Sequence, residues 1–236
     1  MLNYVEYGKE NKYDDDIFFQ KYSQMSRSQQ GLAGAGEWET LRKLLPDFKD
    51  KRVLDLGCGY GWHCIYAMEH GASSVVGVDI SHKMLEVAKE KTHFPQVEYK
   101  CCAIEDVEFP EESFDVILSS LAFHYVADYE ILVKKIYRIL KSGGNLVFTA
   151  YGTQDWYYNE KGEILHFPVD NYYYEGKRTA VFLGEKVTKF HRTLTTYLNT
   201  LLSNGFIINH IVEPQPPENM MDIPGMQDEM RRPMML

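Results

Sequence analysis

The chain has 236 residues, a formal net charge of −9 at pH 7, and 44% hydrophobic residues. This length suits one α/β domain with a sizeable core, so we expect a single domain over residues 1–236. The acidic excess would repel phosphate backbones, which excludes nucleic acid as a partner. No stretch approaches the about 20 apolar residues of a membrane span, and acids and tyrosines stand where a signal peptide needs an apolar run. We therefore predict a cytoplasmic protein with no membrane partner.

The four cysteines are Cys58, Cys64, Cys101 and Cys102. They show neither CxxC pairing nor a histidine at metal-ligand spacing, so no metal site is predicted. We expect them to be reduced and mostly buried.

The first 36 residues precede the first predicted strand. Asp14, Asp15 and Asp16 begin a predicted helix that continues through Tyr22, because acids favour the positive end of a helix dipole. The glycine- and alanine-rich residues 32–36 predict a hinge, which would make residues 1–36 a lid segment. Trp38 opens a helical apolar stripe that ends at Pro46 and is typical of core packing.

The central stretch reads strand, glycine turn, helix, strand. Residues 52–56 are short and apolar, as parallel strands buried on both faces are. The turn Gly57-Cys58-Gly59-Tyr60-Gly61 follows, and the second strand, residues 75–78, ends in Asp79, which lies 22 positions after Gly57. An acid at about this distance typically binds an adenosine ribose. A dinucleotide fingerprint would need glycine at position 62, where this chain has tryptophan.

On these residues the chain resembles the class I S-adenosylmethionine-dependent methyltransferases, in the small-molecule branch of ubiquinone/menaquinone-type enzymes (methyltransferase type 11). The resemblance extends from about Trp38 to Val147. It implies S-adenosylmethionine as cofactor and S-adenosylhomocysteine as product. The implied cofactor residues around the turn and second strand are Asp55, Gly57, Cys58, Gly59, Gly61, Trp62 and Asp79.

Further cofactor contacts follow from the same resemblance. Tyr22 and Arg27 stand where relatives meet the methionine carboxylate, although a packing tyrosine and a solvated arginine are equally compatible with the pattern. Ile80 and Met84 stand where relatives pack the adenine edge, or they are plain core residues. The segment Ala103-Ile104-Glu105 resembles one that often reads Asp-Ala-Glu, so adenine recognition would pass to the backbone at Ile104 and to Glu105.

The predicted fourth strand, residues 113–120, opens onto the active site, because open parallel sheets bind ligands beyond their carboxyl ends. Ser119 is expected at the cofactor. His124 is the candidate catalytic residue: an imidazole near its ordinary pKa accepts a proton, or alternatively shapes the loop through hydrogen bonds. Phe19, His124 and Tyr125 are assigned to the substrate site.

After a predicted helix over residues 131–140, Gly143 and Gly144 are expected to end it before a strand over residues 145–148. Residues 151–184 form an aromatic insertion, which would cover the substrate or form a small β-hairpin satellite. Tyr151, Trp156 and His191 are assigned to substrate binding, His191 with a solvent-facing alternative. Many relatives insert a Glu-His-Pro segment after this strand, and this chain lacks it.

A helix over residues 194–202 and a sixth strand over residues 206–212 complete the pattern. The predicted fold is α/β and Rossmann-like: doubly wound, mostly parallel, with an antiparallel last strand that is short or truncated. The predicted function is methyl transfer by in-line displacement from S-adenosylmethionine to an O, N, S or C atom of a small molecule. The alternatives are a cofactor-binding module with little or no turnover, a macromolecular methyltransferase and a nicotinamide oxidoreductase; a homodimer is compatible with the pattern.

Overall fold

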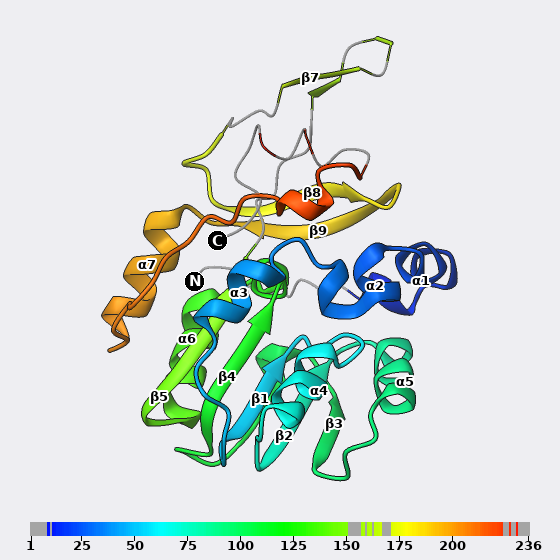
Figure 1. Cartoon of the computed structure of the whole chain (residues 1–236). Helices are drawn as coiled ribbons and strands as arrows, with labels where there is room; N and C mark the ends of the chain where they lie inside the picture. The colour runs from blue at the N-terminus through cyan, green and yellow to red at the C-terminus, as the bar shows by residue number, and fades with distance from the viewer. Residues whose placement is uncertain are drawn as a thin grey trace.

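The computed structural model describes residues 9, 11–150, 157–158, 160–161, 163–166, 171–223, 227 and 230. Its centre is a five-stranded sheet in the order β3-β2-β1-β4-β5, in which every neighbouring pair is parallel (Figure 1). The strands are β1 (Arg52–Leu56), β2 (Ser74–Asp79), β3 (Val97–Cys101), β4 (Phe114–Ser120) and β5 (Leu140–Thr149). The predicted Rossmann-like α/β fold is confirmed.

Alternating strand residues supply two separate cores, because successive side chains of a strand point to opposite faces. Val53 and Val75 pack on the face covered by α4 (Trp62–Glu69) and α5 (His82–Lys91). Leu54 packs on the other face, against α6 (Tyr129–Ile139) and α7 (Leu194–Ser203). All three side chains are fully buried. The sheet is therefore wound on both faces, as its apolar strands predict.

The N-terminal segment consists of short helices that lie at the carboxyl end of the sheet (Figure 1). They are η1 (Lys12–Asp14), α1 (Asp16–Ser23), α2 (Ser26–Gln30), η2 (Gly31–Gly34) and α3 (Trp38–Leu44). Asp15 caps α1 by accepting a hydrogen bond from Phe18 N at 2.9 Å. Asp14 accepts hydrogen bonds from Ser81 Oγ at 2.6 Å and Lys83 N at 3.2 Å. The segment is thereby attached to the first turn of α5.

An antiparallel hairpin, β8 (Gly176–Phe182) and β9 (Glu185–His191), lies over the carboxyl ends of the parallel strands (Figure 1). A second short pair, β6 (Tyr157–Tyr158) and β7 (Ile164–His166), precedes it. Ala180 and Val187 of the hairpin pack on Phe18 of α1 in a small separate core. The hairpin begins within the predicted insertion, residues 151–184, and extends beyond it to His191.

Two boundary predictions around β5 are wrong. Gly143 and Gly144 do not end α6, which finishes at Ile139; they lie inside β5. The register of β4 on β5 shifts there, from Phe114 opposite Leu140 to Val116 opposite Asn145, so the strand continues through an irregularity that accommodates the glycines.

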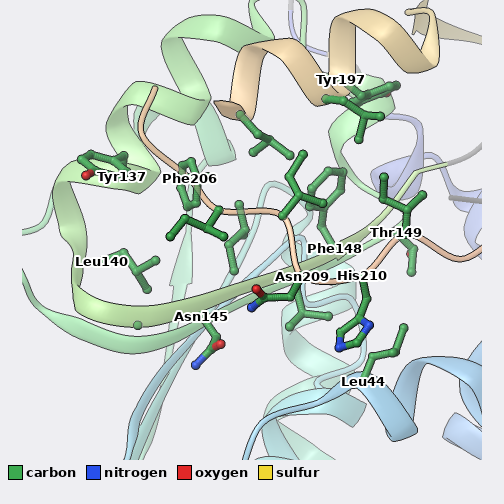
Figure 2. Close-up of a pocket in the computed structure, with 18 of the residues that line it drawn as sticks. Leu44, Tyr137, Leu140, Asn145, Phe148, Thr149, Tyr197, Phe206, Asn209 and His210 are labelled. Atoms are coloured by element: carbon green, nitrogen blue, oxygen red, sulfur yellow. The ribbon is translucent and has the colours of Figure 1, made fainter. Parts of the chain in front are cut away.

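Residues 206–212 do not form the predicted sixth strand. They join no ladder of the described sheets, and together with residues of β5 they line a cavity of about 960 Å³ (Figure 2). Phe206 and Ile208 still pack on the core, whereas Ile207 is 85% exposed. The predicted antiparallel last strand would begin in residues 232–236, which lie outside the described residues.

The cysteine prediction holds in part. Cys58 and Cys64 are buried and all four thiols are free, but Cys101 at the end of β3 is exposed. Among the residues that the structure describes, no helix is both long and apolar enough to span a membrane, and no group of three or more His, Cys, Asp or Glu side chains forms a potential metal site.

Candidate functional site

A cavity of about 420 Å³ lies at the carboxyl end of the sheet, between the N-terminal helices and the β8–β9 hairpin. Many residues predicted from the sequence line it together: Tyr22, Arg27, Gly57, Gly59, Asp79, Ile80, Met84, Ala103, Ile104, Glu105, His124 and Tyr125. These residues come from separate segments of the chain. The sheet brings them together because the ends of parallel strands meet at one edge.

The glycine turn is fixed to the neighbouring strand by its own backbone. Gly57 N and Cys58 N both donate to Val78 O, at 2.8 and 2.9 Å. Gly59 has a φ of 53°, and a Cβ built on it would meet nothing within 4 Å. The turn therefore presents bare backbone to the cavity at Gly59, where a side chain would occupy space that a ligand can use.

The carboxylate of Asp79 faces this turn. Its two oxygens accept hydrogen bonds from Gly59 N and Ser81 N, each at 2.9 Å. Burial raises the pKa of Asp79 to about 6, although these backbone hydrogen bonds act in the opposite direction. A carboxylate oxygen has more than one acceptor position, so both oxygens keep capacity for a ligand hydroxyl. The arrangement suits a vicinal diol.

Other residues predicted at the cofactor lie beneath the turn and do not line the cavity. Asp55 is fully buried, accepts a hydrogen bond from Cys64 Sγ at 3.5 Å, and has its pKa raised by burial to about 7. Ser119 Oγ donates to Leu56 O at 2.8 Å. Cys58, Gly61 and Trp62 are likewise outside the lining. The Trp62 ring lies 4.9 Å from Lys91 Nζ.

Arg27 in the cavity wall forms a buried ion pair that the sequence did not predict. Its Nη2 lies 2.8 and 2.7 Å from the two oxygens of Glu37, which is 3% exposed. Ser120 Oγ donates to the same carboxylate at 3.3 Å. The partners are ten residues apart across η2, so no helical or strand period signals their contact.

Among the described residues, four tyrosine and phenylalanine rings line the cavity, and of these only Tyr13 is not predicted at the site or in the aromatic insertion. The hydroxyls of Tyr13 and Tyr125 form a hydrogen bond at 3.2 Å, and the ring centroids of Tyr13 and Tyr22 lie 5.2 Å apart. Burial raises the pKa of Tyr13 well above its usual range. From the predicted aromatic insertion, Phe182 reaches the wall together with Val181.

Three other described aromatic residues of the insertion, Tyr172, Tyr173 and Tyr174, do not line the cavity. Tyr173 and Tyr174 are 87% and 77% exposed, and Tyr172 contacts His191. His191 Nε2 is 2.8 Å from Tyr172 O, and His191 does not line the cavity. Tyr151 and Trp156, which were assigned to the substrate, lie outside the described residues. Phe19 packs edge-on against Tyr60 rather than in the wall.

His124 lies in η4 (Phe123–Tyr125), directly beyond β4, and is 3% exposed. Its pKa is well below its usual value because of burial and because of the nearby charges of Lys189 and Arg192. The expectation of an ordinary pKa is therefore wrong. The imidazole is neutral at pH 7, and it offers a hydrogen-bonding nitrogen rather than a strong base.

Two cations of the hairpin end border η4. Lys189 is 7% exposed and lines the cavity, with its Nζ 5.9 Å from the Tyr125 ring centroid and 5.7 Å from that of Phe182. Arg192 donates to three backbone carbonyls of residues 123–127, including Ala127 O at 3.0 Å. Sequence spacing carries no signal for Lys189, because β9 reaches the cavity only through the hairpin.

Comparison with known proteins identifies the family. Residues 54–148 match the model of a methyltransferase domain. An uncharacterized protein of Haemophilus influenzae is 34% identical over 222 residues, which cover 86% of this chain and 85% of that protein.

Solved structures agree with this match. A Listeria monocytogenes protein, provisionally named an S-adenosylmethionine-dependent methyltransferase, is 54% identical with a TM-score of 0.82, covering 87% of this chain and 96% of that chain. An S-adenosylmethionine-dependent methyltransferase from Mesorhizobium loti is 38% identical with a TM-score of 0.79, covering 87% and 97%.

Phosphoethanolamine N-methyltransferase 2 of Haemonchus contortus, solved with phosphomonomethylethanolamine and S-adenosylhomocysteine, is 26% identical with a TM-score of 0.59, covering 84% of this chain and 43% of that one. The chain therefore belongs to the class I S-adenosylmethionine-dependent methyltransferases, in the methyltransferase type 11 family, and takes S-adenosylmethionine as its methyl donor.

Proposed function

We propose that this enzyme methylates a small molecule and binds both the cofactor and the acceptor in the 420 Å³ cavity. The observation that carries the proposal is the position of Asp79 against bare backbone at Gly59, inside a cavity of small-molecule size. The N-terminal segment and the hairpin wall this cavity above the sheet. A site covered in this way favours a small acceptor over a macromolecular one.

The residues present fit the cofactor in three parts. Arg27 and Tyr22 would hold the methionine carboxylate; both Arg27 contacts to Glu37 use Nη2. Asp79 would accept hydrogen bonds from the ribose hydroxyls. The wall formed by residues 80, 84, 103 and 104 is apolar and suits a flat base, with Glu105 at its edge. Asp55, Cys58, Gly61, Trp62 and Ser119 would support the turn from below.

When bound, S-adenosylmethionine supplies an electrophilic methyl group on a sulfonium centre. The enzyme needs no nucleophile of its own, so its residues would contribute by aligning the acceptor and excluding water. Leu121, His124 and Tyr125 lie beyond β4 and would contact the acceptor. Leu121 has a φ of 56°, a left-handed conformation that is strained for leucine. Its N–H donates to Thr149 Oγ1 at 3.0 Å, which helps to hold that backbone in place.

His124 would orient the acceptor as a neutral hydrogen-bonding group. Because its pKa is low, it remains neutral through the physiological range and would accept a hydrogen bond from an acceptor hydroxyl or amine. A strong general base is not required when the acceptor is already nucleophilic. The absence of the Glu-His-Pro segment found in many relatives agrees with this role.

The relatives also support a small acceptor. The phosphoethanolamine N-methyltransferase from Haemonchus contortus was solved with a small phosphorylated amine and S-adenosylhomocysteine. Phosphoethanolamine N-methyltransferase 3 of Arabidopsis thaliana is 32% identical over 127 residues, covering 52% of this chain and 26% of that protein. We infer an acceptor of comparable size, methylated on N, O, S or C.

The test combines calorimetry with a turnover assay. S-adenosylhomocysteine is titrated into the wild-type enzyme, into Asp79→Ala, and into Glu130→Gln, whose exposed carboxylate pairs with Lys134 on α6. We expect loss of affinity for Asp79→Ala alone. Release of S-adenosylhomocysteine is then measured across small amines, phenols, thiols and carbon acids, and across tRNA and protein. Turnover confined to the macromolecules, or cofactor binding without any turnover, would contradict the proposal.

A further inference from the structure

We propose that the acceptor carries an anionic group, a carboxylate or a phosphate, which Lys189 binds at the hairpin end of the cavity. The inference rests on the proposed function and names the class of its substrate.

The first support is the position of Lys189. It comes from β9, is 7% exposed, and lines the same cavity as Asp79. Its Nζ lies within 6 Å of the ring centroids of both Tyr125 and Phe182, and both of these residues line the cavity. Most lysines keep their ammonium in solvent, whereas the ammonium of Lys189 lies beside the cavity and near two aromatic rings.

The second support is the distribution of charge along the cavity. Among the described residues of the wall, the acidic side chains are Asp79, which ends β2, and Glu105, which follows β3, and both belong to the proposed adenosyl end. Lys189 lies at the other end, next to His124 and close to Arg192. Lys9, also in the wall, pairs with Asp106 at the adenosyl side. Arg27, also in the wall, is paired with Glu37. Lys189 and Arg192 therefore place positive charge where the acceptor would bind, and this charge would attract an anion.

The third support is the chemistry of the contacts. An anionic oxygen forms a charge-assisted hydrogen bond with an ammonium, and such a bond is stronger than a neutral hydrogen bond. A carboxylate or phosphate entering the cavity would therefore add a strong contact to those that Lys189 already makes. Because Lys189 donates in three directions, it can bind either anion without a planar geometric match.

An anion bound at Lys189 would direct the rest of the acceptor toward Leu121 and His124. These residues follow β4, whereas Lys189 is in the hairpin above η4, and all three line the same cavity. The acceptor would then be held at one end by its charge and would present its nucleophile at the other.

The experiment uses the enzyme saturated with S-adenosylhomocysteine and three probes of similar size: phenyl phosphate, benzoate and the neutral benzyl alcohol. Calorimetry measures each affinity for the wild-type enzyme, for Lys189→Met and Lys189→Arg, and for the control Lys186→Met, an exposed lysine on the same strand. We expect at least one anion to bind tenfold or more tightly than benzyl alcohol. Lys189→Met should abolish that preference, Lys189→Arg should restore part of it, and Lys186→Met should retain it.

The two anionic probes also distinguish a phosphate acceptor from a carboxylate acceptor. Equal binding of all three probes, or an anion preference that survives Lys189→Met, would overturn the inference. Affinity for S-adenosylhomocysteine is measured on each variant as a folding control. If the wild-type enzyme itself does not bind S-adenosylhomocysteine, the proposed function fails; if it binds but shows no Lys189-dependent preference, only this inference fails.

Discussion

Arg27 Nη2 lies between the two carboxylate oxygens of Glu37, at 2.8 and 2.7 Å. Ser120 Oγ at the end of β4 donates to the same carboxylate, so Glu37 joins the N-terminal segment to β4. Glu37 is 3% exposed and the Arg27 side chain is 22% exposed. A buried ion pair contributes little relative to apolar residues, but removing one partner leaves an uncompensated charge. The pair should therefore matter for the stability of the cavity wall as well as for cofactor binding.

We expect Glu37→Leu to lower the free energy of unfolding by about 3 kcal/mol, because Arg27 loses its partner while remaining largely buried. The control is Glu39→Leu, which removes an exposed acid paired with Arg42 and should cost less than about 1 kcal/mol. Urea unfolding measures both. The double variant Arg27→Met, Glu37→Leu should recover most of the lost stability. If Glu37→Leu and Glu39→Leu lowered the free energy of unfolding equally, the Arg27–Glu37 pair would not be buried in solution.

Affinity for S-adenosylhomocysteine should fall as the pH decreases below about 6. The pKa of Asp79 in the free enzyme is about 6, and the ionised carboxylate is the better acceptor for ribose hydroxyls. Calorimetry between pH 5 and 8 should therefore show weaker binding at the acidic end. Asp79→Asn should weaken binding at pH 8 by roughly tenfold to a hundredfold and flatten the profile, since hydrogen bonds to charged groups are worth about 1.5–3 kcal/mol. A wild-type affinity that does not change with pH would exclude this role of Asp79.

Asp55 should make the protein less stable as the pH rises. Its pKa is about 7 in the folded enzyme and about 3.9 when unfolded, so between these values the folded state holds a proton that the unfolded state releases. The stabilisation is complete below about pH 4 and is lost as the pH approaches 7. Asp55→Asn has no carboxyl to ionise, so it does not lose stability in this way. Its free energy of unfolding relative to wild type should rise by about 1.4 kcal/mol per pH unit between about pH 4 and pH 7.

Asp115 provides a matched contrast for that measurement. Burial by itself would raise the pKa of Asp115. Hydrogen bonds from Arg52 N and from Lys141 outweigh burial, and the pKa of Asp115 is lowered. Its stabilisation is therefore present above its unfolded pKa and is lost as the pH falls. Urea unfolding of Asp115→Asn should show its largest deficit at neutral pH, the opposite trend to Asp55→Asn. Parallel trends for the two variants would contradict the assignment of Asp55 as a buried, protonated carboxyl.

Two glycines of the cofactor turn should respond differently to alanine. A methyl group at Gly59 meets no atom within 4 Å, so Gly59→Ala should cost only the about 1–2 kcal/mol of a left-handed conformation while narrowing the cavity. A methyl group at Gly61 would lie 2.2 Å from the Tyr99 hydroxyl. We expect Gly59→Ala chiefly to weaken S-adenosylhomocysteine binding and Gly61→Ala chiefly to lower the melting temperature. The reverse pattern, from calorimetry and thermal melts, would show that Gly59 does not face the ligand.

The sequence by itself determined the central sheet and the turn that seats the cofactor. The strands β1, β2 and β4 contain short apolar runs, the glycine turn follows β1, and Asp79 ends β2 at a fixed spacing from that turn. Each of these features depends on neighbouring residues, and a parallel α/β sheet converts that local order into one edge where strand ends meet. Local spacing is therefore sufficient to predict that Asp79 and Gly59 lie together.

Only the tertiary structure decided the rest of the cavity wall. Tyr13 comes from the N-terminal helices and Lys189 from the hairpin, and nothing periodic in their sequence positions indicates that they line the same cavity. The pairing of Arg27 with Glu37 is likewise not signalled by their spacing. The low pKa of His124 arises from burial and from cations more than sixty residues away. Residues 206–212 show the same limit, since a strand needs a partner within hydrogen-bonding distance as well as an apolar pattern. Local pattern specifies elements, whereas long-range packing specifies which elements meet.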